Sequence, residues 1–216
     1  LFWACVYGFW NFRNGEPAKE AFLSIFSGHY HMWFLFLIAG LYFVSPLLRC
    51  IVGNAQVLRY YLLCFAALDF AVPWLMDCLL LMRIPHTVDA LTAIRLAYDR
   101  LLGYLPSENV FYFVLGNYLA SKEMPKKNRL TLYIMGVIGY IGTILLTRRQ
   151  SLLNESLDLT FLRNGSVNVF LMSVAVFVFG KYGMSRRNPE GGLRRAVVYM
   201  SQCCFGMYLV HALIIE

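Results

Sequence analysis

The feature that most constrains this chain is a run of uncharged residues from 32 to 48, which follows His29 and His31 and ends at Arg49. As a helix, this run would be about 25 Å long, close to the ~30 Å hydrocarbon core of a bilayer. Two of the four histidines therefore lie at the start of a predicted membrane span. The rest of the sequence has to indicate which side of the membrane that start faces.

The composition is that of an integral membrane protein. Hydrophobic residues make up 59% of the chain and charged residues 14%, whereas soluble domains have about 25% charged residues. The apolar runs are too long for barrel strands and do not alternate. We therefore predict an all-α fold, a polytopic helical bundle that forms one transmembrane domain over residues 1–216. Both termini lie at apolar runs, so we expect a fragment of a longer protein, truncated at both ends.

Seven membrane spans are predicted, the first of them partial. They cover residues 1–10, 32–48, 57–81, 107–121, 130–147, 165–182 and 196–215. The third span carries Asp69 near its middle and Pro73 one turn later, where proline should kink the helix. The fifth carries Gly136, Gly139 and Gly142, which predict a close-packing face for a neighbouring helix.

Residues 82–106 are predicted to be a connector between two spans. Apolar residues recur there at helical spacing, with Asp89, Arg95, Asp99 and Arg100 between them. This pattern is typical of an amphipathic helix that lies on the membrane surface.

The charged residues between the spans predict the topology. If the loops alternate sides, the side of residues 122–129 holds 11 basic and two acidic residues, and the other side holds 8 basic and 9 acidic ones. Because short cytoplasmic loops are rich in Lys and Arg, loop 122–129 is predicted to be cytoplasmic. His31 and His211 then lie near the extracytoplasmic face of the cell membrane. The basic excess is explained by topology, so we expect no nucleic-acid partner.

The six cysteines lie mostly inside apolar runs. Their spacing fits neither a zinc site nor a disulfide framework. We expect them to be small buried residues, and we expect no metal site.

Three apolar stretches occur in an order that is typical of one family. Residues 29–49 read H-Y-H-M-W-F-L, then G-L-Y, then P-L-L-R; residues 111–120 read F-Y-F-V-L-G-N-Y-L-A; residues 205–211 read F-G-M-Y-L-V-H. The chain thereby resembles the membrane acyltransferase type 3 family, which has H-x-W-F-L, F-Y-F-L-L-G-x-Y-L-A and S-F-G-I-Y-L-I-H spans.

The resemblance implies transfer of an acyl group, often acetyl, from cytoplasmic acyl-CoA to a hydroxyl of an extracytoplasmic sugar or cell-surface glycan. The partners it implies are acyl-CoA (acetyl-CoA) as the donor substrate, a carbohydrate acceptor and membrane lipid. The main signature of the family is a basic residue followed eleven positions later by a histidine, and none of the four histidines here has that partner. The main catalytic histidine is therefore expected upstream in the intact protein, or the chain is a non-catalytic relative.

Two residues are the catalytic candidates for O-acyl transfer, which needs a base for the acceptor hydroxyl. Histidine titrates near neutrality, and the match to H-x-W-F-L selects His31 over His29. The alternative for His31 is a helix-start histidine bonded to a neighbouring loop. Asp69 is the second candidate, because a carboxylate at the bilayer centre is costly and should face the bundle interior. Its alternatives are a structural pair or a protonated carboxyl.

Five further residues are candidates for binding. Trp33 is a possible sugar-stacking platform or an interfacial anchor, and His211 is placed by the resemblance near the same outer mouth. Asn117 would bind substrate or a neighbouring helix. Arg49 and Arg59 lie on the predicted cytoplasmic side, where they would bind the CoA phosphates or serve topology alone.

A second function class uses the same residues. A non-enzymatic transporter or exporter of a glycan or small molecule would also need an intramembrane acid and outward-facing histidines. An inverted repeat of the spans is typical of transporters, and none is evident in this sequence.

Overall fold

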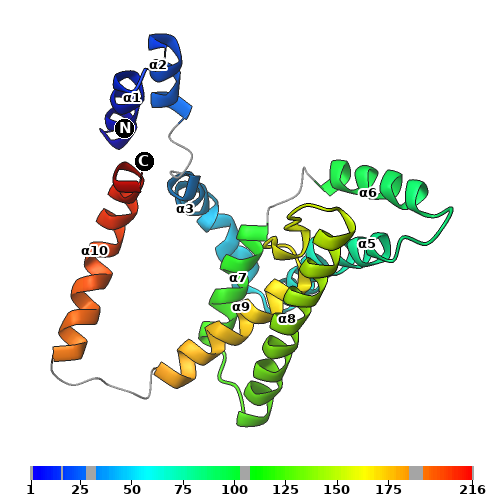
Figure 1. The fold of residues 1–216 in the computed structure, drawn as a ribbon. Helices are drawn as coiled ribbons and strands as arrows, with labels where there is room; N and C mark the ends of the chain where they lie inside the picture. Colours follow the sequence, from blue (N-terminus) through cyan, green and yellow to red (C-terminus); the bar gives the residue numbers. More distant parts are fainter. Residues whose placement is uncertain (1, 16, 28–32, 103–107, 185–191, 216) are drawn as a thin grey trace. The chain divides into compact units, whose positions relative to one another are not determined.

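The computed structural model describes residues 2–15, 17–27, 33–102, 108–184 and 192–215 (Figure 1). Within these ranges the regular structure is helical and no strand occurs, which confirms the predicted all-α fold. In chain order the helices are α1 (Phe2–Arg13), α2 (Ala18–Ser27), α3 (Trp33–Gly53), α4 (Ala55–Phe65), the π-helical turn η2 (Ala66–Ala71), α5 (Val72–Leu81), α6 (Val88–Leu102), α7 (Glu108–Ser121), α8 (Lys126–Leu153), the 3₁₀ turn η3 (Thr160–Leu162), α9 (Val167–Phe179), the π-helical turn η4 (Gly180–Met184) and α10 (Gly192–Ile215).

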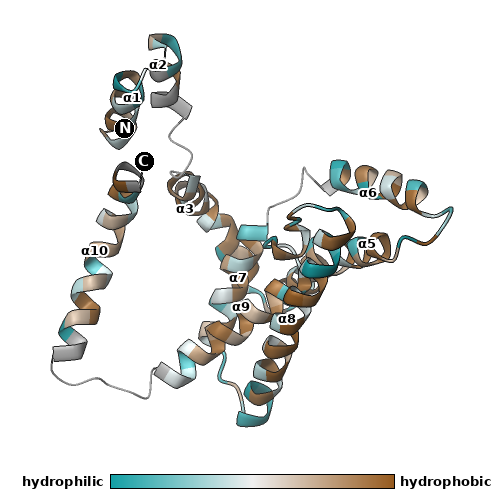
Figure 2. Ribbon diagram, in the orientation of Figure 1, coloured by the Kyte–Doolittle hydropathy of each residue, from teal (hydrophilic) through white to brown (hydrophobic). Residues whose placement is uncertain are grey.

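Four helical stretches of the described chain are long and apolar enough to cross a membrane. They are Trp33–Gly53, Ala55–Leu81, Lys126–Leu153 and Thr160–Gly183, and the brown colour of Figure 2 marks the hydrophobic residues along them. The predicted count of seven spans is not confirmed. Helices α1 and α7, of 12 and 14 residues, are about 18 and 21 Å long, which is shorter than the ~30 Å hydrocarbon core. Helix α10 is not among the four either.

The chain divides into two compact units, which are described separately. The first comprises Leu1–Pro46 and Asn188–Glu216, and the second Leu47–Arg187. In the first unit, the buried Tyr7 of α1 donates its hydroxyl proton to the carbonyl of Leu209 in α10 at 2.8 Å. Leu35 of α3 packs against Tyr7, so α1, α10 and the start of α3 share a small core.

Helices α8 and α9 form the closest helix pair of the second unit. A Cβ atom built at Gly139 would lie 2.6 Å from the carbonyl oxygen of Asn168, and one at Gly136 would overlap the Cβ of Ala175. These two glycines therefore permit the close approach, as the sequence predicted. Gly142 has open space around it and takes no part in the contact.

Aromatic side chains join η2 and α7 to this pair. The ring of Phe70 lies 4.9 Å from that of Phe111 in α7 and 5.1 Å from that of Phe170 in α9, measured between centroids. Phe70 and Phe111 are each only 1% exposed. The turn η2 is thus anchored in the core of the second unit.

The connector forms a helix, α6, within the predicted range, but polar contacts attach it to α5 and η2. Arg95 donates to Asp77 at 2.7 Å and to the carbonyl of Pro73 at 2.7 Å, and Tyr98 donates to the carbonyl of Leu68 at 2.7 Å. Figure 1 shows α5 and α6 side by side. The apolar periodicity predicted the helix, and these polar side chains determine what it packs against.

Candidate functional site

The turn η2 interrupts the helical span Ala55–Leu81 next to Pro73. A π-helical turn bonds an N–H to the carbonyl five residues earlier, as Val72 does to Ala67. In that register the partner of the Leu68 carbonyl would be the N–H of residue 73, which proline lacks. The Tyr98 hydroxyl fills this position at 2.7 Å. The predicted kink residue is therefore accommodated by a π-helical turn and by a donor from α6.

Asp69 lies on this turn with a carboxylate oxygen that has no partner. Its Oδ2 is buried and makes no hydrogen bond to any described residue. A buried acceptor without a donor costs free energy, and π-helical turns occur often at functional sites. No hydrogen bond to a described residue therefore accounts for the burial of this Asp69 oxygen.

A second acid lies close to Asp69, across Gly165. A Cβ atom built at Gly165 would lie 3.1 Å from Oε1 of Glu108 and 3.3 Å from the carbonyl oxygen of Asp69. Glu108 begins α7, and Gly165 precedes α9 by two residues. Asp69 therefore lies level with the starts of two neighbouring helices, α7 and α9.

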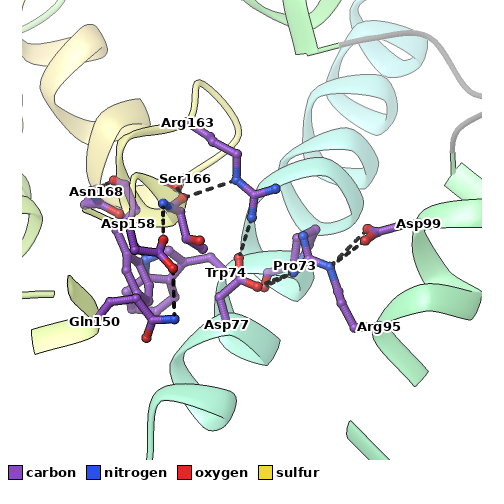
Figure 3. Close-up of polar contacts among 12 residues, drawn as sticks. Pro73, Trp74, Asp77, Arg95, Asp99, Gln150, Asp158, Arg163, Ser166 and Asn168 are labelled. Carbon is purple, nitrogen blue, oxygen red and sulfur yellow. Dashed lines mark hydrogen bonds and ion pairs between the residues drawn. The ribbon is translucent and has the colours of Figure 1, made fainter. Parts of the chain in front are cut away.

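Beyond Asp69, one carboxylate joins α5 to α6 and to the loop before α9 (Figure 3). Asp77 accepts from Arg95 at 2.7 Å and from Arg163 at 3.3 Å, and Arg95 also pairs with Asp99 at 3.0 Å. The side chains of Asp77 and Arg95 are each 13% exposed, so this ion pair is shielded from solvent. Burial raises the pKa of the neighbouring Tyr98, which keeps its hydroxyl protonated as a donor to η2.

The loop between α8 and α9 is held in place by a separate set of polar contacts. Arg83 donates to the carbonyl of Leu153 at 3.0 Å and to Oδ1 of Asn154 at 2.8 Å. Asp158 accepts from the Thr160 N–H at 2.9 Å and from the Asn154 amide at 2.8 Å. Hydrogen bonds from Thr160 hold the pKa of Asp158 below its usual range. The loop that places Arg163 and Gly165 is therefore built by contacts within itself and to α5.

A buried amide connects this loop to three helices. Asn168, 4% exposed, accepts from Trp74 Nε1 at 3.0 Å and donates to the Thr143 hydroxyl and the Phe161 carbonyl at 2.7 Å each. Sequence reasoning missed Asn168, Trp74 and Thr143, as well as the roles of Glu108 and Tyr98. A polar residue at the start of an apolar span was the available signal, but several spans carry one.

The predicted site residues are divided between the two units. His31 lies outside the described residues. Trp33 begins α3 and is 58% exposed, and His211 in α10 has its Nδ1 2.6 Å from the carbonyl oxygen of Tyr208. The rings of Phe34 and Tyr208 meet edge to face at 5.7 Å. The first unit thus brings the start of α3 and the His211 turn of α10 together.

The other predicted residues belong to the second unit. Arg49 and Arg59 are exposed, on the two helices that meet at Asn54. Asn117 is exposed on α7, nine residues beyond Glu108. Of the predicted residues in this unit, only Asp69 lies on η2.

Asp69 and Glu108 are acids of the kind that bind a hydroxyl or accept its proton. Asp69 offers a free carboxylate oxygen, and Glu108 provides a second acid next to it. The described residues contain no group of three or more His, Cys, Asp or Glu side chains arranged to hold a metal. General acid–base chemistry is what such an arrangement supports.

Comparison with known protein families gave a match over the whole chain. The family model for an acyltransferase domain, Acyl_transf_3, matches residues 1–216. No curated protein and no solved structure matches the chain. This protein therefore belongs to the membrane acyltransferase type 3 family.

Proposed function

We propose that this membrane acyltransferase is an O-acyltransferase with acyl-CoA, in the simplest case acetyl-CoA, as its donor. The acceptor is a hydroxyl of an extracytoplasmic sugar or cell-surface glycan. The observation that carries the proposal is the free carboxylate oxygen of Asp69 on a π-helical turn, in a chain that the acyltransferase family model matches over its full length. Structural pairing does not account for this carboxylate.

The reaction assigns a role to each group. The acceptor hydroxyl oxygen attacks the thioester carbonyl, an ester C–O bond forms and the C–S bond breaks. His31 assists removal of the hydroxyl proton, which passes to the departing CoA thiolate, and Asp69 is a second polar group that binds or orients substrate. The proposed substrate-binding residues are Trp33 and His211 in the first unit and, separately, Asn117 in the second. Arg49 and Arg59 bind the CoA phosphates, for which guanidinium groups are well suited.

Contacts between the loops support the proposed sidedness. Loops that the charge count assigns to one side meet one another in the second unit. Lys181 bonds to the carbonyls of residues 119, 120 and 122, at the predicted cytoplasmic end. Arg83 and Asp77 reach Asn154 and Arg163 at the other end. This grouping agrees with the alternation of the loops between two sides, and the excess of basic residues is what assigns loop 122–129 to the cytoplasm in our proposal.

The test uses two histidines that are close in the sequence, His29 and His31, as a matched pair. The full-length protein in proteoliposomes is given acetyl-CoA labelled in the acetyl group, and label in an added glycan is measured. We expect His31→Ala to lower transfer at least about 100-fold, the scale of a lost general base. His29→Ala, the control, should retain most activity. Equal activity of the two variants would remove His31 from the mechanism.

The same assay separates the transporter alternative. A transporter would move unmodified glycan across the vesicle membrane without consuming acetyl-CoA. Glycan movement with no CoA release, in vesicles that contain the intact protein, would therefore contradict the proposed transferase activity.

A further inference from the structure

The pair α8–α9 carries an elongated apolar groove. One cavity of about 400 Å³ lies between the two helices, with Gly136 and Ala175 in its wall. At one end its wall includes Tyr133 and Phe179, whose rings meet edge to face at 6.3 Å. The other end is lined by Tyr140 and Met172.

A second cavity continues the groove. It measures about 660 Å³ and shares Tyr140 and Met172 with the first. Leu157 and Leu162, from the loop between the helices, also line it. The loop therefore contributes to one end of the groove, whereas the other part lies open between the helices.

The end of the groove beneath the loop has a charged residue in its largely apolar wall. Arg148 lines this end, is exposed, and has no ion pair with any carboxylate of the described chain. A guanidinium without a counter-charge at the end of an apolar groove complements an anionic group on an apolar ligand.

We propose that this groove binds one anionic phospholipid, with its headgroup at Arg148 and an acyl chain along α8 toward Tyr133. From Tyr133 to Arg148 the helix is about 22 Å long, similar to one bilayer leaflet with its headgroups. A flexible acyl chain can fit beneath the loop between α8 and α9, where a transmembrane helix could not. The charge at one end and the apolar walls elsewhere complement an anionic amphiphile.

Two pairs of adjacent residues test this site. Arg148 lines the groove and Arg149 does not; likewise Val137 lines it and Ile138 does not, although these two are 58% and 55% exposed. The full chain is purified from equal mixtures of phosphatidylglycerol and phosphatidylcholine, and bound lipid is counted by native mass spectrometry. We expect Arg148→Gln to lower the ratio of bound phosphatidylglycerol to phosphatidylcholine about fivefold, with Arg149→Gln unchanged.

The second pair tests the acyl-chain portion. Val137→Trp should fill the groove and abolish retention of the lipid, whereas Ile138→Trp should not. Equal retention in the members of each pair would overturn the proposal. It would also be overturned if Val176→Cys formed cross-links between two copies and the protein retained no lipid, because a second copy would then occupy the groove. Each surface variant leaves the helix core intact, so the comparison does not depend on a folding defect.

Discussion

The second unit contains two π-helical turns that differ in the surroundings of their charged residue. In η4, Lys181 donates to the carbonyls of Leu119, Ala120 and Lys122 at 3.1, 2.9 and 2.7 Å. These are carbonyls at the C-terminal end of α7, which have no partner within the helix. In η2, Asp69 keeps an oxygen without any partner in the described structure. The comparison separates a charge used for structure from one that remains available for chemistry.

The two turns also differ in the contacts that hold them in place. In η2, donors from α6 satisfy the carbonyls around Pro73, so the Asp69 side chain is not needed for that purpose. In η4, the neighbouring Tyr182 accepts from the Met124 N–H at 2.7 Å and lies 4.2 Å beneath the Arg129 guanidinium. The side chains of η4 thus hold loop 122–125, whereas η2 is itself held by another helix. Activity should therefore depend on η2 and stability on η4.

The largest expected effect is on activity, from Asp69→Asn. The amide keeps the shape but loses the charge, so acetyl transfer should fall by about 100-fold or more. Thermal stability should be unchanged or higher, because a buried charge without a partner is removed. Transfer of labelled acetyl and the Tm in detergent are measured on the same preparation.

Asp89→Asn is the control for that change, since Asp89 is an exposed acid in the first turn of α6. If the Asp69 variant kept full activity, or lost activity only in step with a fall in Tm, then η2 would have a structural role only, like η4.

The opposite result is expected for Lys181→Met. Three carbonyls lose a charged donor, which should cost about 2 kcal/mol and lower the Tm by about 4–8 °C. Activity per folded molecule should remain close to that of the wild type. Lys127→Met, at an exposed position of α8, controls for loss of a cytoplasmic charge. A Tm shift no greater than that of the control would mean that η4 is not held by Lys181.

A third change acts on the space between the two acids. In Gly165→Ala the new methyl group would lie 3.1 Å from Glu108 and 3.3 Å from the Asp69 carbonyl. Because a small displacement of catalytic groups is costly, we expect activity to fall about tenfold with little change in Tm. Gly142→Ala places the same methyl group in open space and should leave activity unchanged. An active Gly165 variant would argue that the relative positions of Asp69 and Glu108 do not matter.

Helix type and approximate bounds followed from the sequence because apolar runs and periodicity depend on local residues. The glycine contact at Gly136 and Gly139 and the acid at Asp69 were predictable in the same way. The neighbours of Asp69 were not, because Glu108 at the start of α7 and Gly165 in the loop before α9 are distant from it in the chain. Tyr98 is an ordinary aromatic in an amphipathic pattern until its hydroxyl is seen at Leu68. The count of seven spans is not confirmed for a related reason, since α7 lies at a family motif but is short for a membrane span.

The smallest expected effect tests the support of η2 from α6. Tyr98→Phe removes only the hydroxyl that bonds to the Leu68 carbonyl, which should cost about 1 kcal/mol. The amides of residues 68–74 should exchange hydrogen faster, because the π-helical turn loses its external donor while its packing through Phe70 remains. Tyr42→Phe, at a 77% exposed position of α3, is the control and should change neither Tm nor exchange. If exchange in η2 stayed unchanged, its shape would be set by Pro73 and the aromatic core alone, and α6 would have no part in holding Asp69.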